Sequence, residues 1–317
     1  MNHQQKPQEG NLTNLKEFVL LGFSDVPDLQ WVLFGLLIAM YCFILLGNGT
    51  IVLITKVDAA LQTPMYFFLG NFSFLEICYV SITLPRMVFN LGTQRRTISF
   101  IACATQMCCT LILGATECFL LAVMAYDRYV AICNPLRYPL VMNQKVCSQL
   151  VIGSWISGIP IQIGQTSHIF SLSFCGSHQI NHFCDIPPIL HLACGDTFIN
   201  EMMVFLGAFL FVLFPFLLIV FSYSKIISTV LKLSSTKSRA KAFSTCSSHL
   251  AVVILFFGSA MITYFRSNTS HSGETDKVLS LFYTVVTPMF NPMVYSLRNK
   301  DVTIALRKFL CKQFVKI

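Results

Sequence analysis

The chain has 317 residues, of which 55% are hydrophobic and only 11% are charged, and its formal net charge is +8. A water-soluble domain carries roughly 25% charged residues, because it must present a polar surface to water. Such a depletion of charge excludes an ordinary soluble domain and indicates that lipid is the solvent for most of the protein surface.

Seven segments carry almost no charge, and each is about as long as the roughly 20 residues that a helix needs to cross a bilayer. They are Leu29–Thr55, Ala59–Pro85, Thr97–Tyr126, Val146–Gly164, Met202–Ser224, Ala242–Phe265 and Val278–Leu297. Their ionisable residues are Glu76, Glu117 and His249. We therefore predict an all-α membrane protein, a seven-transmembrane helix bundle over residues 29–297.

The residues before the first segment, 1–28, open with the polar stretch MNHQQKPQEG. This stretch lacks the apolar core of a cleavable signal peptide, so we expect the first segment to act as its own insertion signal. With this end outside, 15 of the 22 Lys and Arg residues fall on the inner side. The positive-inside rule then predicts a multi-pass plasma-membrane protein with an extracellular N-terminus and a cytoplasmic C-terminus. Anionic inner-leaflet lipid accounts for the positive charge without a nucleic-acid partner.

The strongest local motif, Asp127-Arg128-Tyr129, lies at the inner end of the third segment. An Asp beside an Arg at the edge of the hydrocarbon is costly unless the charges are paired or used. Two interpretations stay open. In the first, Arg128 is a membrane anchor whose guanidinium group reaches the lipid headgroups. In the second, Asp127 holds Arg128 in the resting state and releases it to a partner on activation.

The outer side of the predicted topology carries four cysteines, Cys103, Cys175, Cys184 and Cys194. Disulfides form and persist on that side of the membrane. Four cysteines permit three pairings, and the spacing does not choose between them. The long outer segment Gln165–Glu201 also holds four histidines, but their spacing matches no tetrahedral site, so we expect no metal. The sequons at Asn11 and Asn268 lie outside as candidate glycosylation sites.

The inner start of the sixth segment, residues 237–249, is basic and then small and polar. It suits a helix end that swings out to admit a partner, and it equally suits anchoring to lipid headgroups. In the seventh segment, Pro292 removes a backbone donor, while Asn291 and Tyr295 offer side-chain hydrogen bonds in compensation. A kinked helix end of this kind is a natural two-state element.

Residues 298–317 follow the last segment and are predicted to be cytoplasmic. Within them, apolar residues recur at helical spacing between Lys and Arg over Arg298–Phe314. This pattern is typical of a short amphipathic helix lying on the membrane surface. Cys311 is a candidate palmitoylation site, and an ordinary cytosolic thiol is the equal alternative.

Together these motifs resemble those of rhodopsin-like G-protein-coupled receptors. Asn48, Trp155 and Pro215 stand at matching places in the first, fourth and fifth segments. Four longer stretches resemble olfactory receptors in particular: Leu61–Leu69 (LQTPMYFFL), Met124–Cys133 (MAYDRYVAIC), Lys241–Leu250 (KAFSTCSSHL) and Pro288–Asn299 (PMFNPMVYSLRN). The resemblance covers nearly the whole chain. Gln62, Ser247 and Glu76 depart from the family's usual His, Ala and Asp.

The resemblance implies a receptor that binds small volatile odorants and activates a stimulatory, olfactory-type G protein to raise cyclic AMP. It implies the disulfides Cys103–Cys184 and Cys175–Cys194, which would pin the long outer loop over the bundle. It places Tyr223 and His249 near Arg128, among the residues of activation. The implied ligand residues share an apolar, uncharged lining; they are Met107, Thr110, Leu111, Gly114, Gly207, Phe211, Phe257, Met261, Tyr264 and Thr284. For each of them, packing of helix against helix is the alternative.

Glu76 and Glu117 face the bundle interior near one another, by the same resemblance. They form either a sodium or proton site that biases the resting state, or two neutral carboxyls that serve packing. No other cofactor is expected.

Other classes of membrane protein fit less well. Transporters usually show paired repeats, and intramembrane enzymes need a nucleophile with a base or a set of metal ligands, none of which the sequence displays. A non-olfactory receptor of the same superfamily, sensing a metabolite, is the remaining alternative.

Overall fold

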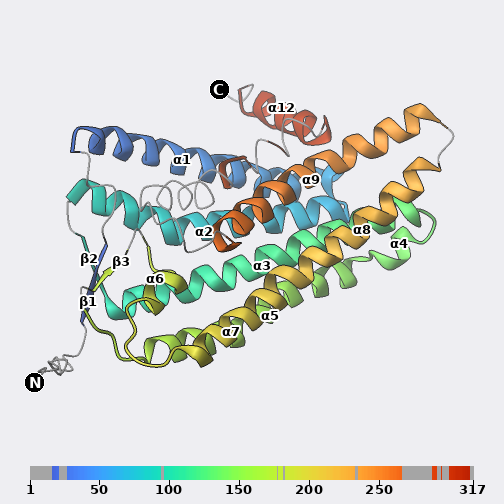
Figure 1. The fold of residues 1–317 in the computed structure, drawn as a ribbon. Helices are drawn as coiled ribbons and strands as arrows, with labels where there is room; N and C mark the ends of the chain where they lie inside the picture. The colour runs from blue at the N-terminus through green and yellow to red at the C-terminus, as the bar shows by residue number, and fades with distance from the viewer. Residues whose placement is uncertain are drawn as a thin grey trace, which may run out of the picture.

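The computed structural model describes residues 16–20, 27–93, 96–176, 178–180, 183–232, 235–265, 288–290, 294 and 300–314. Long helices run alongside one another through the length of the molecule (Figure 1). Three short strands and the helix α6 (Ile186–Leu190) lie at one end, and the short helix α4 (Tyr138–Val141) lies at the other. We call these the strand end and the α4 end.

The first two long helices, α1 (Pro27–Val57) and α2 (Pro64–Thr93), are joined by a single 3-10 turn, Ala59–Leu61. Asp58 caps this turn by accepting a hydrogen bond from the backbone N–H of Ala60 at 3.0 Å. Pro64 opens α2 at the one helical position where a missing N–H costs nothing. The second apolar segment was therefore predicted wrongly to begin at Ala59, and its helix continues past Pro85 to Thr93.

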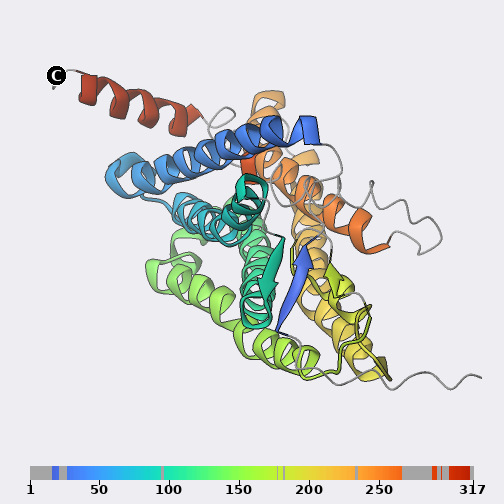
Figure 2. The same ribbon diagram turned by 90° about the vertical axis from the view of Figure 1, so that its left-hand side faces the viewer.

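A small sheet covers the helix ends at the strand end, as Figure 2 shows. Strand β1 (Glu17–Leu20) lies in the middle, antiparallel to β2 (Thr97–Ser99) and parallel to β3 (Gln179–Ile180). The helices were predicted from the sequence, but this small sheet was not. In particular, Thr97 belongs to a strand and not to the third helix, which Ser99 caps by accepting a hydrogen bond from the N–H of Ala102.

Two long helices follow. They are α3 (Phe100–Cys133) and α5 (Gln144–Phe170), with α4 between them. After the outer loop and α6, the chain continues through α7 (Phe198–Ala208), a π-helical turn at Phe209–Leu213 and α8 (Phe214–Leu231). Pro215 explains the π-helical turn, because its ring has no N–H to donate and collides with the carbonyl of Phe211 in a regular helix.

The last described helices are α9 (Thr236–Phe265) and α12 (Lys300–Phe314). Helix α12 packs against α1 and the 3-10 turn, with Val302 and Ala305 buried. Tyr66 at the start of α2 donates a hydrogen bond to Asp301 at 3.0 Å. The amphipathic pattern at the end of the sequence thus forms a helix tied to the first two long helices.

Five described helical stretches are long and apolar enough to cross a membrane, namely Gln30–Val57, Pro64–Thr93, Phe100–Cys133, Gln144–Phe170 and Phe198–Leu231, and Cys246–Gly258 adds a shorter apolar one. Large apolar side chains cover their outer surfaces; Leu46 is 72% exposed and Phe205 68%. Exposure on this scale needs lipid around it. The chain is a multi-pass membrane protein. The predicted seventh segment, Val278–Leu297, lies outside the described residues except for 288–290 and 294.

The buried apolar residues form two separate cores. The larger core fills the space between α1, α2, α3, α8, α9 and α12. The smaller core lies at the strand end and joins Phe18 and Leu20 of β1 to Ile98, Cys103, Ile169 and the outer loop. The strand end is therefore a packed cap and not a loose set of loops.

Candidate ligand and signalling sites

The ion pair predicted in the third apolar segment lies at the α4 end of α3. Arg128 donates to Asp127 with 2.6 Å between nitrogen and oxygen, and the two side chains are only 11% and 1% exposed. Removing one partner from such a buried pair leaves an uncompensated charge, which costs about 3–5 kcal/mol. The pair is held inside the bundle, which favours the interpretation of a restrained arginine over that of a membrane anchor.

Tyr138, at the start of α4, completes this cluster. Its hydroxyl donates to the second carboxylate oxygen of Asp127 at 2.8 Å. Burial, and then the negative charge of Asp127, raise the pKa of Tyr138 well above its ordinary value, so the hydroxyl keeps its proton and remains a donor. This residue was not predicted from the sequence. The available signal was weak: Tyr138 is the one aromatic residue in the loop between α3 and α5.

Arg128 also faces α9. It lies within electrostatic range of Cys246 and His249, both buried on that helix. His249 in turn shares a hydrogen bond of 2.7 Å with the hydroxyl of Tyr223 on α8, and the two rings stack. The structure thus brings together Asp127, Arg128, Tyr223 and His249, four of the residues predicted for activation. Tyr129, which follows Arg128 on α3 and was also predicted for activation, is half-buried and packs against the larger core.

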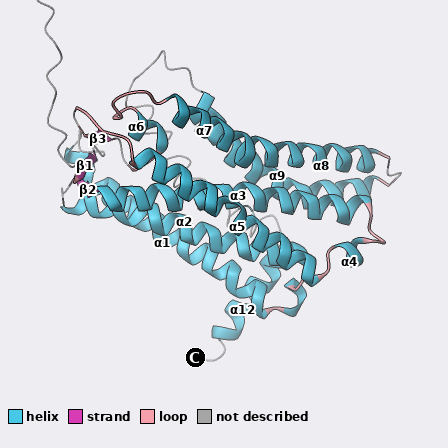
Figure 3. Ribbon diagram, turned by 90° about the horizontal axis from the view of Figure 1, so that it is seen from below, coloured by secondary structure: helices cyan, strands magenta, loops and turns pink. Residues whose placement is uncertain are grey.

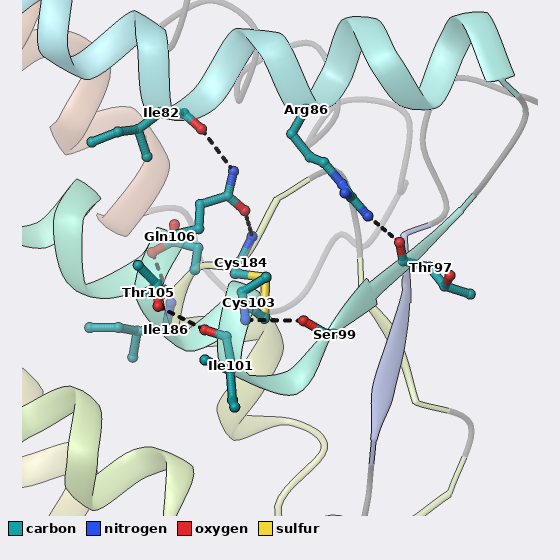
Figure 4. The surroundings of a disulfide bond; sticks show 12 residues. Ile82, Arg86, Thr97, Ser99, Ile101, Cys103, Thr105, Gln106, Cys184 and Ile186 are labelled. Carbon is teal, nitrogen blue, oxygen red and sulfur yellow. Dashed lines mark hydrogen bonds between the residues drawn. A yellow bond between two sulfur atoms is a disulfide. The ribbon is translucent and has the colours of Figure 1, made fainter.

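At the strand end, one disulfide joins Cys103 to Cys184 and a second joins Cys175 to Cys194. These are the two pairings that the family resemblance implied. Figure 4 shows that Gln106, one turn after Cys103, reinforces the first bridge. It accepts a hydrogen bond from the backbone N–H of Cys184 and donates one to the carbonyl of Ile82, both at 3.3 Å. Arg86 donates to the carbonyl of Thr97 and so holds β2 against α2.

Phe18 is the centre of the cap. It is fully buried, stacks on Phe100 with 6.0 Å between ring centroids, and meets Phe170 and Phe174 edge-on. These rings belong to β1, α3, α5 and the outer loop. The cap therefore includes the N-terminal strand as well as the loop, a contact that was not predicted from the sequence.

The four predicted ligand residues on α3 lie below this cap. Two of them pack in or against the smaller core, and two do not. Met107 is fully buried in the cap core and Leu111 packs against it. Thr110 has a buried hydroxyl oxygen without a hydrogen-bond partner among the described residues. One turn further, Gly114 faces open space, because a Cβ built on it would meet nothing within 4 Å. Thr110 and Gly114 are therefore the pair best placed to meet a ligand.

The remaining predicted ligand residues lie on later helices. Gly207 is buried against Gln165 of α5, and Phe211 meets Phe119 of α3 edge-on at 6.1 Å. Phe257 is buried against Phe216 of α8. Each of these three residues contacts a side chain of another helix. The side chains of Met261, Tyr264 and Thr284 lie outside the described part of the chain.

Glu76 of α2 and Glu117 of α3 are both buried, and their carboxyl groups hydrogen-bond to each other. A hydrogen bond between two carboxyls needs a proton on one of them. Among the described residues, no group of three or more His, Cys, Asp or Glu side chains has the arrangement of a metal site. The structure thus brings the two acids together as predicted from the resemblance.

Several predicted site residues lie outside the described residues, or have side chains that do. They are Asn291, Pro292 and Tyr295 of the last apolar segment, the sequon residues Asn11 and Asn268, and the thiol of Cys311.

The fold is that of a multi-pass membrane protein whose polar side chains lie inside the bundle and at its two ends. A sequence model of the olfactory receptor family matches residues 37–313. Human olfactory receptor 10AG1 is 62% identical over 297 residues, which cover 93% of this chain and 99% of that receptor. Human olfactory receptors 10A7 and 10C1 are 49% and 50% identical, over 96% and 95% of this chain and 97% of each relative. The chain belongs to the olfactory receptor family and is a receptor, not an enzyme.

Proposed function

We propose that this receptor binds small, volatile, uncharged odorants between its helices and activates a stimulatory, olfactory-type G protein, which raises cyclic AMP. The observation that carries the proposal is the buried pair of Asp127 and Arg128, closed by Tyr138. A buried arginine held by an ion pair at one end of a membrane bundle can be freed when a ligand binds elsewhere and shifts the packing of the helices. Membership of the olfactory receptor family supports the choice of ligand.

The proposal includes a complete bundle of seven spans in the plasma membrane, with the N-terminus outside and the C-terminus inside. Both disulfides lie at the strand end, and disulfides persist on the outer, oxidising side. The ion pair and α12 then lie on the inner side. Helix α12 rests on the inner leaflet, where its exposed Arg307 and Lys308 meet anionic lipid.

Activation is proposed to separate Arg128 from Asp127 while α9 moves away from α3. Tyr223 and His249 stabilise the resting arrangement, because their hydrogen bond ties α8 to α9 beside the arginine. Asn291, Pro292 and Tyr295 form the two-state element of the last span. The G-protein tail enters where Arg128 and the start of α9 meet.

The odorant is proposed to bind below the cap, against Thr110 and Gly114. The unpartnered hydroxyl of Thr110 is the polar contact, and the open space at Gly114 receives the apolar body of the ligand. A mostly apolar site with one hydroxyl gives an affinity that comes mainly from burial. Phe211, Phe257, Met261, Tyr264 and Thr284 complete the proposed lining.

Glu76 and Glu117 are proposed to hold a sodium ion or a shared proton that favours the resting state. Their burial and mutual contact support the proposal, since two ionised carboxylates cannot stay together inside a bundle without a cation. Sodium would bind between the carboxylates in place of the proton.

The proposed signalling is tested by measuring cyclic AMP in cells that express the receptor and the olfactory G protein, challenged with a broad panel of volatile compounds. We expect a dose-dependent response that Arg128→Ala lowers roughly tenfold or more, because the cation that receives the G protein is gone. The exposed Arg307→Ala is the matched control and keeps the response. A full response from Arg128→Ala, at equal surface expression, contradicts the role of Arg128.

Tyr138→Phe removes only the hydroxyl that closes the ion pair. Losing one hydrogen bond to a charged group costs about 1 kcal/mol or more, so ligand-independent cyclic AMP should rise about fivefold. Tyr41→Phe is the control, because the hydroxyl of Tyr41 pairs with that of Ser81 away from the ion pair. If both variants keep the basal level of the native receptor, the closing role of Tyr138 is wrong.

Thr110→Val keeps the shape of the side chain and deletes its hydroxyl. We expect the half-maximal concentration of oxygen-bearing odorants to rise roughly fivefold to tenfold, as for the loss of one hydrogen bond, while pure hydrocarbons keep their potency. Thr116→Val on the same helix is the control, since the hydroxyl of Thr116 already bonds to the carbonyl of Ile112 at 2.8 Å. Equal shifts for the two variants would place the odorant elsewhere.

Glu117→Gln removes the charge at the acid pair. The sodium form of the proposal predicts that activation loses its dependence on sodium concentration, because one of the two carboxylate ligands is gone. The shared-proton form predicts a change in the pH dependence of basal signalling instead. Cyclic AMP measured across sodium and pH series separates the two, and a variant that matches the native receptor in both series eliminates the site.

A further inference from the structure

The structure contains a cavity of about 510 Å³ that none of the proposed ligand or activation residues accounts for, apart from the ring of Tyr129 at its edge. It is lined by α3, α5 and α8, which run alongside one another toward the α4 end (Figure 3). Its volume falls within the range of sites for single small molecules. We propose that it binds one membrane sterol.

The cavity opens on the lipid-facing surface of the helices. Its wall on α5 includes Gly153 and Ser157, and its wall on α8 includes Leu218 and Phe221; all four residues are exposed on membrane-crossing helices. Any occupant therefore arrives from the bilayer. This step requires only that the helices cross a membrane, so it stands independently of the proposed odorant and G protein.

The depth of the cavity suits a molecule of one leaflet. Along α5 its lining begins at Gln149 and ends at Ser157, and α5 itself begins at Gln144. At 1.5 Å per residue these positions lie about 8 and 20 Å from the start of the helix. The site thus extends through roughly the inner half of a hydrocarbon core about 30 Å thick, in the orientation proposed above.

The polar groups of the cavity gather at its inner end. Gln149 is exposed there, and no hydrogen bond of its amide is found among the described residues. Tyr126 and Tyr129 of α3 lie at the same end. Further along, the hydroxyls of Ser154 and Ser157 are already used, since they donate to backbone carbonyls of α5. The cavity therefore offers a hydrogen bond at its inner end, an apolar shaft, and no charged side chain in its lining.

The lining of the shaft combines two kinds of side chain. Phe119, Tyr126 and Phe221 present aromatic rings, and Ala122, Gly153 and Ser157 present small surfaces. A rigid, flat ring system with a single hydroxyl fits between such walls and loses little conformational freedom on binding. A flexible acyl chain loses more conformational entropy for the same buried area. A charged headgroup is also disfavoured, because the lining has no side chain of opposite charge. These features favour a sterol, with its hydroxyl at Gln149.

The test uses the full-length receptor purified into phosphatidylcholine nanodiscs and a cholesterol analogue that carries a photoactivatable diazirine. After irradiation, mass spectrometry maps the labelled peptides. We expect label on the cavity residues of α3, α5 and α8, and competition by excess cholesterol. Label confined to other helices, or undiminished by cholesterol, overturns the proposal.

Two glycines of α5 provide a matched pair of variants. Gly153 lies in the cavity and Gly164 outside it, both are exposed, and a Cβ on either meets nothing within 4 Å. Gly153→Leu should lower cavity labelling roughly fivefold or more, equivalent to about 1 kcal/mol of lost binding, because its side chain occupies the space of the ring system. Gly164→Leu should label like the native receptor. Equal labelling of all three proteins overturns the proposal.

A second variant covers the case in which Gly153→Leu does not fold, which its thermal unfolding would reveal. Gln149→Leu keeps the volume of the side chain and removes the amide. It should weaken competition by cholesterol and leave competition by a sterol without the hydroxyl unchanged. Unchanged competition by both sterols contradicts the hydroxyl contact. Competition by a linear fatty alcohol or an odorant as strong as that by cholesterol identifies a different occupant and rejects the sterol site.

Discussion

Hydrocarbon offers no hydrogen-bond partner, so each polar group inside the membrane must find its hydrogen-bond partner within the protein. The long helices satisfy their backbones internally, and their hydroxyl side chains follow the same rule. Thr55, Thr83 and Thr116 each donate to the carbonyl four residues earlier. The same demand shapes the ion pair, where Arg128 takes one oxygen of Asp127 and Tyr138 takes the other. Among the described residues, the buried hydroxyl of Thr110 is an exception to this rule, and for that reason it is the proposed polar contact of the odorant.

The two ends of the molecule are stabilised by different kinds of contact. At the strand end, a sheet, two disulfides and the rings around Phe18 fix a cap whose core is separate from that of the bundle. At the α4 end, the larger core continues between the helices and no disulfide is found among the described residues; single polar contacts link the elements there, namely the ion pair, the hydrogen bond of Tyr223 to His249, and that of Tyr66 to Asp301. In the proposed orientation, the covalently closed end is the outer one, and the end held by single polar contacts is the one proposed to move.

Much of this arrangement follows from the sequence, because composition alone requires lipid and long charge-poor segments require helices. The pairing of Glu76 with Glu117 and the two disulfides came from family resemblance. Other features depend on contacts distant in sequence. The N-terminal strand has only four residues, and its partners lie about 80 and 160 positions away, so no local pattern reveals it. Tyr138 is an ordinary loop residue until α4 turns it toward Asp127. Gly207, predicted to line the ligand site, lies where α7 packs beside Gln165 of α5, a contact that no local pattern reveals.

The parallel pairing of β1 with β3 also sets an order of events during synthesis. Val19 and Leu20 find their neighbours Gln179 and Ile180 only after some 160 further residues have been made. At 5–20 residues per second, that interval is about 8 to 30 s. Until then Phe18 lacks the rings of Phe170 and Phe174 that cover it in the finished receptor. Strand β1 is therefore among the first parts of the receptor to be synthesised and completes its packing late, and in the interval its exposed phenylalanine distinguishes an unfinished chain from a finished one.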